Sequence, residues 1–153
     1  MGMIEQINEN AGQYRGASGA GTPKVSISDE IDLSSTGTKK AVMIPIGSFV
    51  TKVMLYISDA ITAGGTADVD VGDGDDTDRY MDAIGAIATN TLLVAPYPYT
   101  VPSATATEAT TALTESAGYY YASTDTIDVL VNATSTTGSG RVIVEFFTDS
   151  GLA

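Results

Sequence analysis

Strict alternation of apolar and polar residues between Phe49 and Ala83 constrains the fold of this chain more than any other feature. Every second residue is apolar in two segments, which are Val53, Leu55 and Ile57 in the first and Ala67, Val69 and Val71 in the second. A period of two is typical of antiparallel strands that bury one face. The link between them contains Gly64 and Gly65, which permit the positive φ that a chain reversal needs. The stretch therefore predicts a hairpin of two half-buried strands.

The same alternation returns in the C-terminal third of the chain. The residues expected to point inward there are Ile127, Val129 and Val131 and, after the turn sequence TSTTGSG, Val142, Val144 and Phe146. This pattern predicts a second hairpin, preceded by a short strand at Tyr119–Ala122. Further strands are expected at residues 25–33 and 41–50. Pro45 cannot donate a ladder hydrogen bond, so its strand should lie at a sheet edge or end near Ile46 and Gly47, before the next strand begins at Phe49.

Three other segments indicate their structure less sharply. Residues 80–88 fit a short helical turn or a strand. Residues 91–102 contain three prolines, which favours an extended edge segment. Residues 103–116 fit a loop or an edge strand. Because no amphipathic helix separates the strands, we expect an all-β fold, either an antiparallel β-sandwich or a jelly-roll-like fold with seven or eight short strands.

The N-terminal residues differ in composition from the rest. Residues 1–24 are rich in Gly, Ala and Ser and lack periodicity, so we expect a flexible N-terminal arm. Residues 25–153 then form a single β-sandwich domain. Ordering the arm would cost about 1–2 kcal/mol per residue, which its few apolar side chains cannot offset. A partner subunit or a surrounding lattice is the natural source of that free energy.

Charge and residue usage exclude several classes of function. The net charge is −12, with only 7 Lys and Arg, so binding to nucleic acid or to an anionic membrane is not expected. The absence of Cys and His removes disulfides, thiolate catalysis and the commonest general base and metal ligand. No apolar run approaches the roughly 20 residues that span a bilayer. The N-terminus lacks the features of a secretory signal, so we expect a soluble chain made in a cytoplasm.

An acidic loop follows the second strand of the first predicted hairpin. Its carboxylates are Asp73, Asp75, Asp76 and Asp78. Their mutual repulsion would be relieved by a hard cation with oxygen ligands, so calcium is the one cofactor to consider. The loop fails the EF-hand pattern, because the glycine and the final glutamate of that motif are absent. The alternative is a solvated turn whose Asp side chains bond local backbone amides while Arg79 pairs with one of them.

Carboxylates on strands offer a second chemical hypothesis. A glycosidase-type pair could be drawn from Asp68 and Asp70, or from Asp128 and Glu145 on the neighbouring predicted strand. The alternative is that all four lie on the solvent face of half-buried strands. No nucleophile-elbow or phosphate-loop motif is present, and no catalytic residue is predicted. The lysines, as possible bases, fall in turns or on polar faces.

Tyrosines form the other conspicuous group. In the YYY run, Tyr119 and Tyr121 should lie on one face of a strand and Tyr120 on the other, so that both faces are covered. Aromatic residues are enriched at protein interfaces. The residues expected at an interface are Tyr14, Arg15, Tyr97, Tyr99, Tyr119, Tyr120 and Tyr121.

Two sequence stretches resemble small virion proteins of tailed bacteriophages. They are IPIGSFVTKV, which begins at Ile44, and VGDGDDTDRY, which ends at Tyr80. The similarity spans roughly Ala41–Ala83 and points to capsid decoration (cement) proteins or related head-structural proteins. It implies a β-sandwich subunit, often a trimer, that sits on the phage head and bridges neighbouring subunits of the major capsid protein. The implied location is the virion, after synthesis in the bacterial cytoplasm.

The functional expectation is therefore a non-enzymatic capsid decoration subunit that forms a homo-oligomer and needs no cofactor. One alternative is a tail, neck or head-fibre component with a calcium-dependent or carbohydrate-binding role. A second alternative is an enzyme that acts on polysaccharides through a carboxylate pair.

Overall fold

A computed structural model describes residues 23–62, 68–95, 118–133 and 137–148. These residues form ten strands, which are β2 (Lys24–Ile27), β3 (Ile31–Asp32), β4 (Gly37–Ile44), β5 (Ser48–Asp59), β6 (Asp68–Asp73), β7 (Met81–Ile84), β8 (Thr91–Val94), β9 (Tyr119–Tyr121), β10 (Asp125–Ala133) and β11 (Ser139–Thr148). The described part of the chain contains no helix, and hence none that could cross a membrane. The all-β prediction is confirmed, although the expected number of seven or eight strands is too low.

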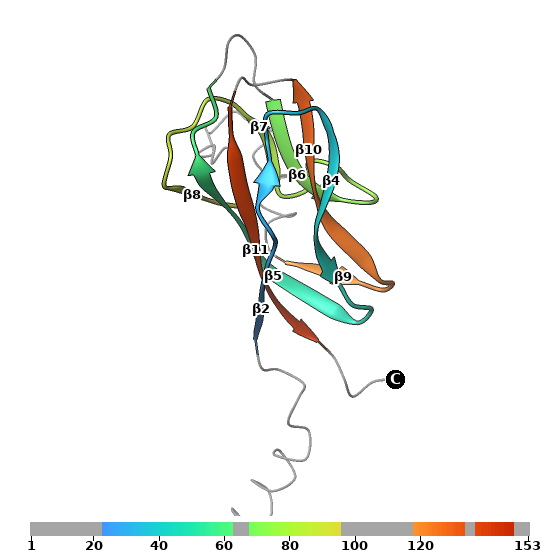
Figure 1. The fold of residues 1–153 in the computed structure, drawn as a ribbon. Helices are drawn as coiled ribbons and strands as arrows, with labels where there is room; N and C mark the ends of the chain where they lie inside the picture. The colour runs from blue at the N-terminus through green and yellow to red at the C-terminus, as the bar shows by residue number, and fades with distance from the viewer. Residues whose placement is uncertain (1–22, 63–67, 96–117, 134–136, 149–153) are drawn as a thin grey trace, which may run out of the picture.

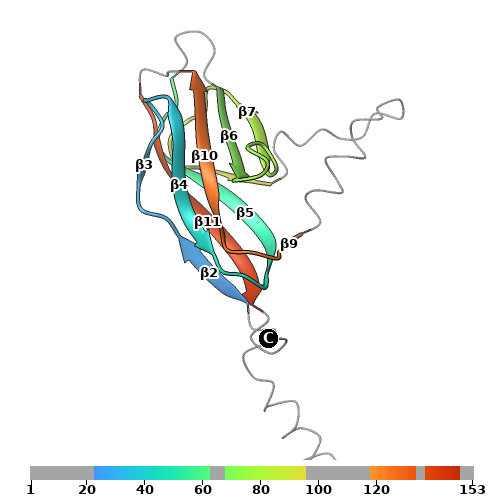
Figure 2. The same ribbon diagram turned by 90° about the vertical axis from the view of Figure 1, so that its right-hand side faces the viewer.

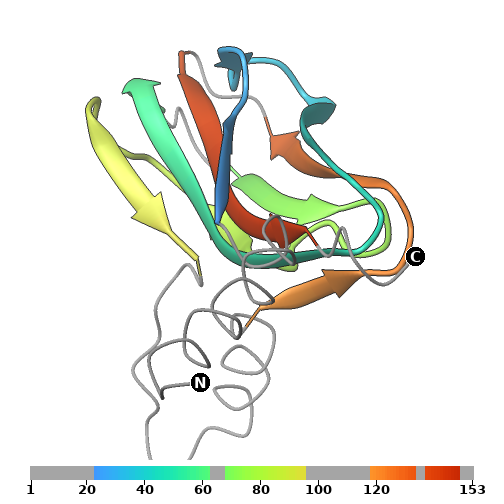
Figure 3. The ribbon, with the colours of Figure 1, turned by 90° about the horizontal axis from the view of Figure 1, so that it is seen from below.

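The strands form two antiparallel sheets that pack face to face as a β-sandwich (Figures 1 and 2). The smaller sheet has the order β4-β10-β6-β7. The larger sheet has the order β2-β11-β5-β8, with β3 also on β11 and β9 also on β5. The short strands β2 and β3 lie one after the other along β11, and β8 and β9 do the same along β5, so the ten strands occupy eight positions in the two sheets. Viewed from below, β8, β5, β11 and β2 follow one another along one layer (Figure 3).

Both predicted hairpins are wrong in their pairing. The strand β5 lies in the six-stranded sheet and β6 in the four-stranded sheet, so the link through Gly64 and Gly65 joins two sheets. In the same way β10 and β11 belong to opposite sheets. Alternation reports which face of a strand is buried, and each of these strands does bury its predicted face. It carries no information about which strand lies alongside, because a sandwich buries the inner faces of both sheets.

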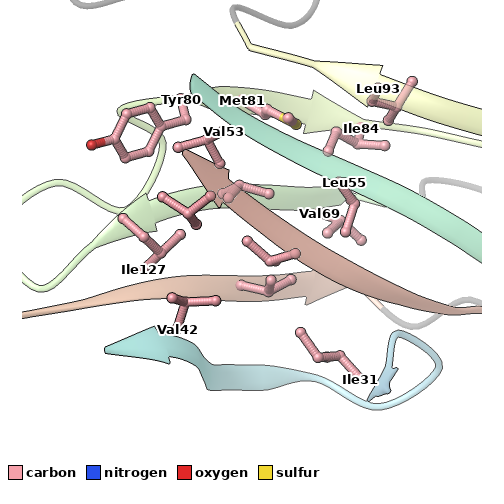
Figure 4. Close-up of a cluster of buried hydrophobic side chains, with 14 of the residues drawn as sticks. Ile31, Val42, Val53, Leu55, Val69, Tyr80, Met81, Ile84, Leu93 and Ile127 are labelled. Carbon is pink, nitrogen blue, oxygen red and sulfur yellow. The ribbon is translucent and has the colours of Figure 1, made fainter. Parts of the chain in front are cut away.

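The core fills the space between the sheets (Figure 4). The predicted inward residues of β5, β10 and β11 are all buried, as are Val69 and Val71 of β6, whereas Ala67 lies outside the described residues. The best-covered side chains, with under 2 % of their surface exposed, include Leu33, Ile44, Leu55, Met81, Ile84 and Ile127. Burying each such side chain stabilises the fold by about 1.5–3 kcal/mol, so this core accounts for most of the cohesion between the sheets.

Two segments whose structure the sequence left open contain strands. Residues 81–84 form β7, and residues 91–94 form β8 at an edge of the larger sheet. The strand β4 is an edge strand of the smaller sheet, as predicted, and it ends at Ile44, directly before Pro45 and slightly earlier than the expected end near Ile46 and Gly47. The expected arm at residues 1–24 and the loop or strand at 103–116 fall almost entirely outside the described residues.

Candidate functional site: the acidic loop and the tyrosine cluster

The acidic loop folds inward at its first carboxylate. Asp73 ends β6 and is only 1 % exposed. Its Oδ1 accepts hydrogen bonds from the backbone amides of Asp75 (3.1 Å) and Asp76 (2.9 Å). The Asp73 amide donates in turn to the carbonyl of Asp76 over 2.8 Å. Local bonding of this kind is what Asp contributes to turns, so the predicted bonding of loop amides is confirmed while Asp73 itself is buried.

The other Asp73 oxygen meets the tyrosine run from the opposite sheet. Tyr121, on β9, donates its hydroxyl proton to Asp73 Oδ2 over 2.7 Å. The hydroxyl oxygen of Tyr80 lies 2.9 Å from that of Tyr121. Since the one Tyr121 proton is committed to Asp73, the Tyr80 hydroxyl is the donor in this second bond. The two features singled out in the sequence are therefore parts of one buried hydrogen-bond network.

Arg79 completes this network. Its Nε lies 2.6 Å from Asp73 Oδ2, which makes the predicted ion pair. Its guanidinium carbon also lies 3.8 Å from the ring centroid of Tyr119, a favourable cation–π distance. Tyr119 in turn packs edge to face on Tyr121, with ring centroids 4.9 Å apart. Burial is the largest single influence on the pKa of Arg79 and would lower it, but the hydrogen bond to Asp73 and the attraction of that carboxylate together raise the pKa.

Burial also governs the acid–base behaviour of the neighbouring groups. It raises the pKa of both the Tyr80 and the Tyr121 hydroxyl, so both stay protonated and can donate. The pKa of Asp76 is raised by its side-chain hydrogen bond to Asp78 and then by partial burial. The network therefore holds one buried carboxylate, one guanidinium and two neutral phenols, which is an electrically balanced arrangement.

A glycine makes the loop geometry possible. A Cβ atom added to Gly72 would lie 2.1 Å from the carbonyl oxygen of Asp76 and 2.3 Å from the carbonyl carbon of Thr77. The loop backbone thus passes directly over β6, and only a residue without a side chain fits beneath it. Gly72 is the sequence signal that this loop folds back onto the strand.

Two strand carboxylates expected on the solvent face are buried instead. Asp70 is 6 % exposed and Asp128 is 7 % exposed. Asp70 accepts hydrogen bonds from the Ala83 amide and the Asn132 side chain. Asp128 lies opposite Gly72 in the ladder, beside the overlying loop, and its Oδ1 has no hydrogen-bond partner among the described residues. Burial raises the pKa of both carboxyls.

The proposed pairing of Asp128 with Glu145 does not occur. Asp128 lies on β10 of the smaller sheet, whereas Glu145 lies on β11 of the larger sheet. Asp68 and Asp70 do share a face of β6, but both Asp70 oxygens accept bonds from protein groups. Within the described ranges, no group of three or more acidic side chains is arranged to hold a metal ion. A depression of about 290 Å³ lies elsewhere, between β3 and β4.

The interface tyrosines divide between the two faces of β9. Tyr119 and Tyr121 point toward the core, as the alternation predicts, and Tyr121 is buried. Tyr120 points outward and is 55 % exposed. Tyr14, Arg15, Tyr97 and Tyr99 lie outside the described residues. Of the described tyrosines in the predicted set, Tyr120 is therefore the one available to a partner.

Comparisons with known proteins identify the fold. No known family model matches the sequence, and no curated protein matches it. Several solved structures match in fold, among them chains of three phage capsids. A chain of the acidic stable capsid structure of Helicobacter pylori bacteriophage KHP30 matches with a TM-score of 0.59 and 17% identity, over 86% of this chain and 91% of that one.

The other two matches are also phage capsid structures. A chain of the cyanophage Pam1 capsid asymmetric unit matches with a TM-score of 0.57 and 18% identity, over 84% of this chain and 86% of that one. A chain of the capsid of Ralstonia phage GP4 matches with a TM-score of 0.54 and 16% identity, over 88% of each chain. At these identities the likeness is one of fold. The chain has the β-sandwich fold of these phage capsid chains.

Proposed function

We propose that this chain is a non-enzymatic structural subunit of a phage virion, a decoration or cement protein that binds the outside of the head and stabilises contacts between coat subunits. The observation that carries the proposal is the fold likeness to chains of three phage capsids over nearly the whole length of both partners. Because the paired coverages are so similar, each matched chain is about as long as this one. The likeness therefore concerns a whole subunit of comparable size.

The strand order adds a second line of support. Numbered by position along the chain, the sheets read 1-8-3-6 and 2-7-4-5 when β2 with β3, and β8 with β9, each count as one position. We infer from this order that the sandwich is a jelly roll, an architecture used by viral capsid domains. Architecture alone does not define function, so it supports the proposal only together with the capsid matches.

The interior of the candidate site favours a structural role over catalysis. The Asp73 carboxylate is saturated by two amides, Arg79 and Tyr121, and is closed to solvent. A catalytic acid or base must reach its substrate, which a carboxylate buried in this way does not. The negative charge of the chain, −12, supports solubility before assembly.

Binding to heads tests the proposal directly. Heads of the parent phage are purified without this chain, mixed with it and sedimented, with isolated tails as the control particle. We expect saturable co-sedimentation with heads only, and an increase in the temperature at which the shell is disrupted, measured by calorimetry. Binding to tails alone would support the tail-component alternative instead. Binding to heads without a change in shell stability would contradict the cement role while leaving decoration intact.

The finer expectations belong to the same proposal. The tyrosine segments and the N-terminal residues are the proposed contacts with neighbouring subunits. The major capsid protein is the proposed partner on the head, and a closed homo-oligomer is the proposed assembly unit. A chain that lacks residues 1–22 should keep its sandwich fold and lose affinity for heads. Unchanged affinity would remove the arm from the contact.

A further inference from the structure

The outer face of the six-stranded sheet carries an uninterrupted apolar row. Ile27, Ile143, Met54 and Val94 are successive ladder partners on β2, β11, β5 and β8. Directly opposed residues of antiparallel strands project on the same side of a sheet. Their neighbours Val53 and Val144 point into the core, so this row faces outward. Ile27 is 61 % exposed and Val94 is 44 % exposed.

A second row crosses the same face nearer its other end. Phe147, Phe49 and Tyr120 are successive partners on β11, β5 and β9. Phe49 and Tyr120 are exposed, whereas the adjacent Val50 and Phe146 are buried. The sheet therefore presents two bands, an aliphatic one across β2, β11, β5 and β8 and an aromatic one across β11, β5 and β9.

The charges on this face differ from those of the chain as a whole. The charged residues of the described outer face are Lys52, Arg141, Glu145 and, at its end beside Ser58 and Ser139, Glu30, so that positive and negative charges cancel on this face. The chain as a whole carries −12, and the β6 residues Asp68 and Asp70 belong to the smaller sheet. Two copies repel each other over most of their surface, and this face is where they can approach without that repulsion.

Lys52 and Glu145 lie opposite each other between the two bands. The one ion pair within the described ranges joins Arg79 to Asp73, so Lys52 and Glu145 are not paired with each other. Glu145 is held in place by a 3.1 Å hydrogen bond from the Thr51 hydroxyl. In a two-fold arrangement of two copies, Lys52 of each can meet Glu145 of the other, which is the self-complementarity that such an interface requires.

The face is large enough to form the centre of such an interface. With strands about 4.8 Å apart and a rise of about 3.3 Å per residue, four strands from Phe49 to Tyr56 cover about 450 Å² in plan. This area is more than half of the roughly 800 Å² per partner of a stable complex. We propose that the outer face of the six-stranded sheet binds the same face of a second copy of this chain, with the aliphatic bands of the two copies in contact at the centre.

The test compares two methionine substitutions that differ only in location. Met54→Glu places a carboxylate in the centre of the aliphatic band. Met43→Glu makes the same change on β4 of the other sheet, where the residue is 69 % exposed. The mass of each full-length protein is measured by light scattering over a hundredfold range of concentration, and circular dichroism checks folding.

We expect a dimer for the unmodified chain and for Met43→Glu. For Met54→Glu the dissociation constant should rise by at least about a hundredfold, because two uncompensated charges would be buried at the centre of the interface. If Met54→Glu is misfolded, Val94→Glu at the sheet edge replaces it. A folded monomer at all concentrations, a trimer, or a dimer that Met54→Glu leaves intact would each overturn the proposal.

Charge exchange gives an independent readout. Lys52→Glu and Glu145→Lys should each weaken the dimer by about tenfold, and the double exchange should restore it, since each close pair contributes modestly. If neither Lys52→Glu nor Glu145→Lys weakens the dimer, the proposed two-fold arrangement is wrong. None of these measurements uses heads, so failure to bind heads and failure to dimerise are distinguishable.

Discussion

Tyr121 donates a 2.7 Å hydrogen bond to Asp73, and the two residues belong to opposite sheets of the sandwich. Asp73 ends β6 and Tyr121 ends β9. The bond therefore fastens the acidic loop to the far layer at one end of the core. Arg79 pairs with the same carboxylate oxygen, so a single buried atom accepts from both a loop side chain and a strand of the other sheet.

Removal of the Tyr121 hydroxyl should destabilise the fold. Tyr121→Phe deletes the donor to Asp73 and leaves the Tyr80 hydroxyl without its acceptor. Leaving a buried polar group unsatisfied costs about 1–3 kcal/mol, so the free energy of unfolding, measured by urea denaturation, should fall by that amount. Tyr120→Phe, on the exposed face of the same strand, should change it by less than about 0.5 kcal/mol. Equal effects of the two variants would contradict the role of the network.

Gly72 should not tolerate a methyl group. Gly72→Ala places a Cβ atom 2.1 Å from a backbone oxygen, so the loop must move away from β6 at a cost of about 2 kcal/mol or more. Gly85→Ala is the matched control, because nothing lies within 4 Å of its Cβ position. Thermal unfolding followed by circular dichroism should show a clear decrease in Tm for the first variant only. A Tm for Gly72→Ala equal to that of the unmodified chain would show that the loop does not pass over this strand.

Two buried carboxyls should contribute more stability in acid than at neutral pH. Burial raises the pKa of Asp128 and Asp70 above the ordinary value of 3.8. At these two groups the folded state therefore binds more protons than the unfolded state, so their contribution to the free energy of unfolding falls as pH rises from about 3.8 through the raised folded pKa.

Substitution of Asp128 isolates its share of this dependence. Asp128→Asn removes the buried charge, so it should raise the Tm at about pH 7. It should also reduce the loss in the free energy of unfolding between about pH 4 and about pH 7. Asp29→Asn, at an exposed position, should leave that loss unchanged. A loss that stays the same in Asp128→Asn would mean that this carboxyl does not titrate differently in the two states.

Calcium should have little effect on stability. Protein donors occupy both oxygens of Asp73, the first carboxylate of the candidate loop. A site with a dissociation constant one hundredth of the calcium concentration would stabilise the fold by about 2.7 kcal/mol. That would raise the Tm by several degrees. We expect the Tm to change by less than about one degree on addition of calcium or of a chelator. A larger increase in Tm with calcium, absent from an Asp75→Asn, Asp78→Asn double variant, would support the calcium hypothesis instead.

The sequence predicts burial better than it predicts partners. Alternation correctly places Val53, Leu55 and Ile57 in the core, because the period of a strand fixes which side chains share a face. The prediction that β5 and β6 pair with each other is wrong. In a sandwich, each connection can either turn within one sheet or cross to the other sheet, and alternation does not distinguish the two. That choice depends on the packing of both sheets together, which no single segment records.

The candidate site shows the same division. The pairing of Arg79 with a loop carboxylate was predictable, because the two residues are close in sequence. The bond between Tyr121 and Asp73 spans 48 positions, so no local pattern indicates it. The burial of Asp128 was missed because its outward position on β10 suggests solvent, whereas a loop from β6 passes beside it. Gly72 in the interior of a strand was the available signal of that close backbone approach.

The position of β11 has a consequence for the order of folding. This strand lies between β2 and β5 and pairs with both, so β2 joins the larger sheet only through a strand that is far away in the sequence. Pairing between strands at such sequence distances is slow, because the entropy of closing a long loop must be overcome first. The larger sheet therefore cannot close before β11 has docked, and the inner faces of β2 and β5 stay uncovered in any partly folded state that lacks this strand.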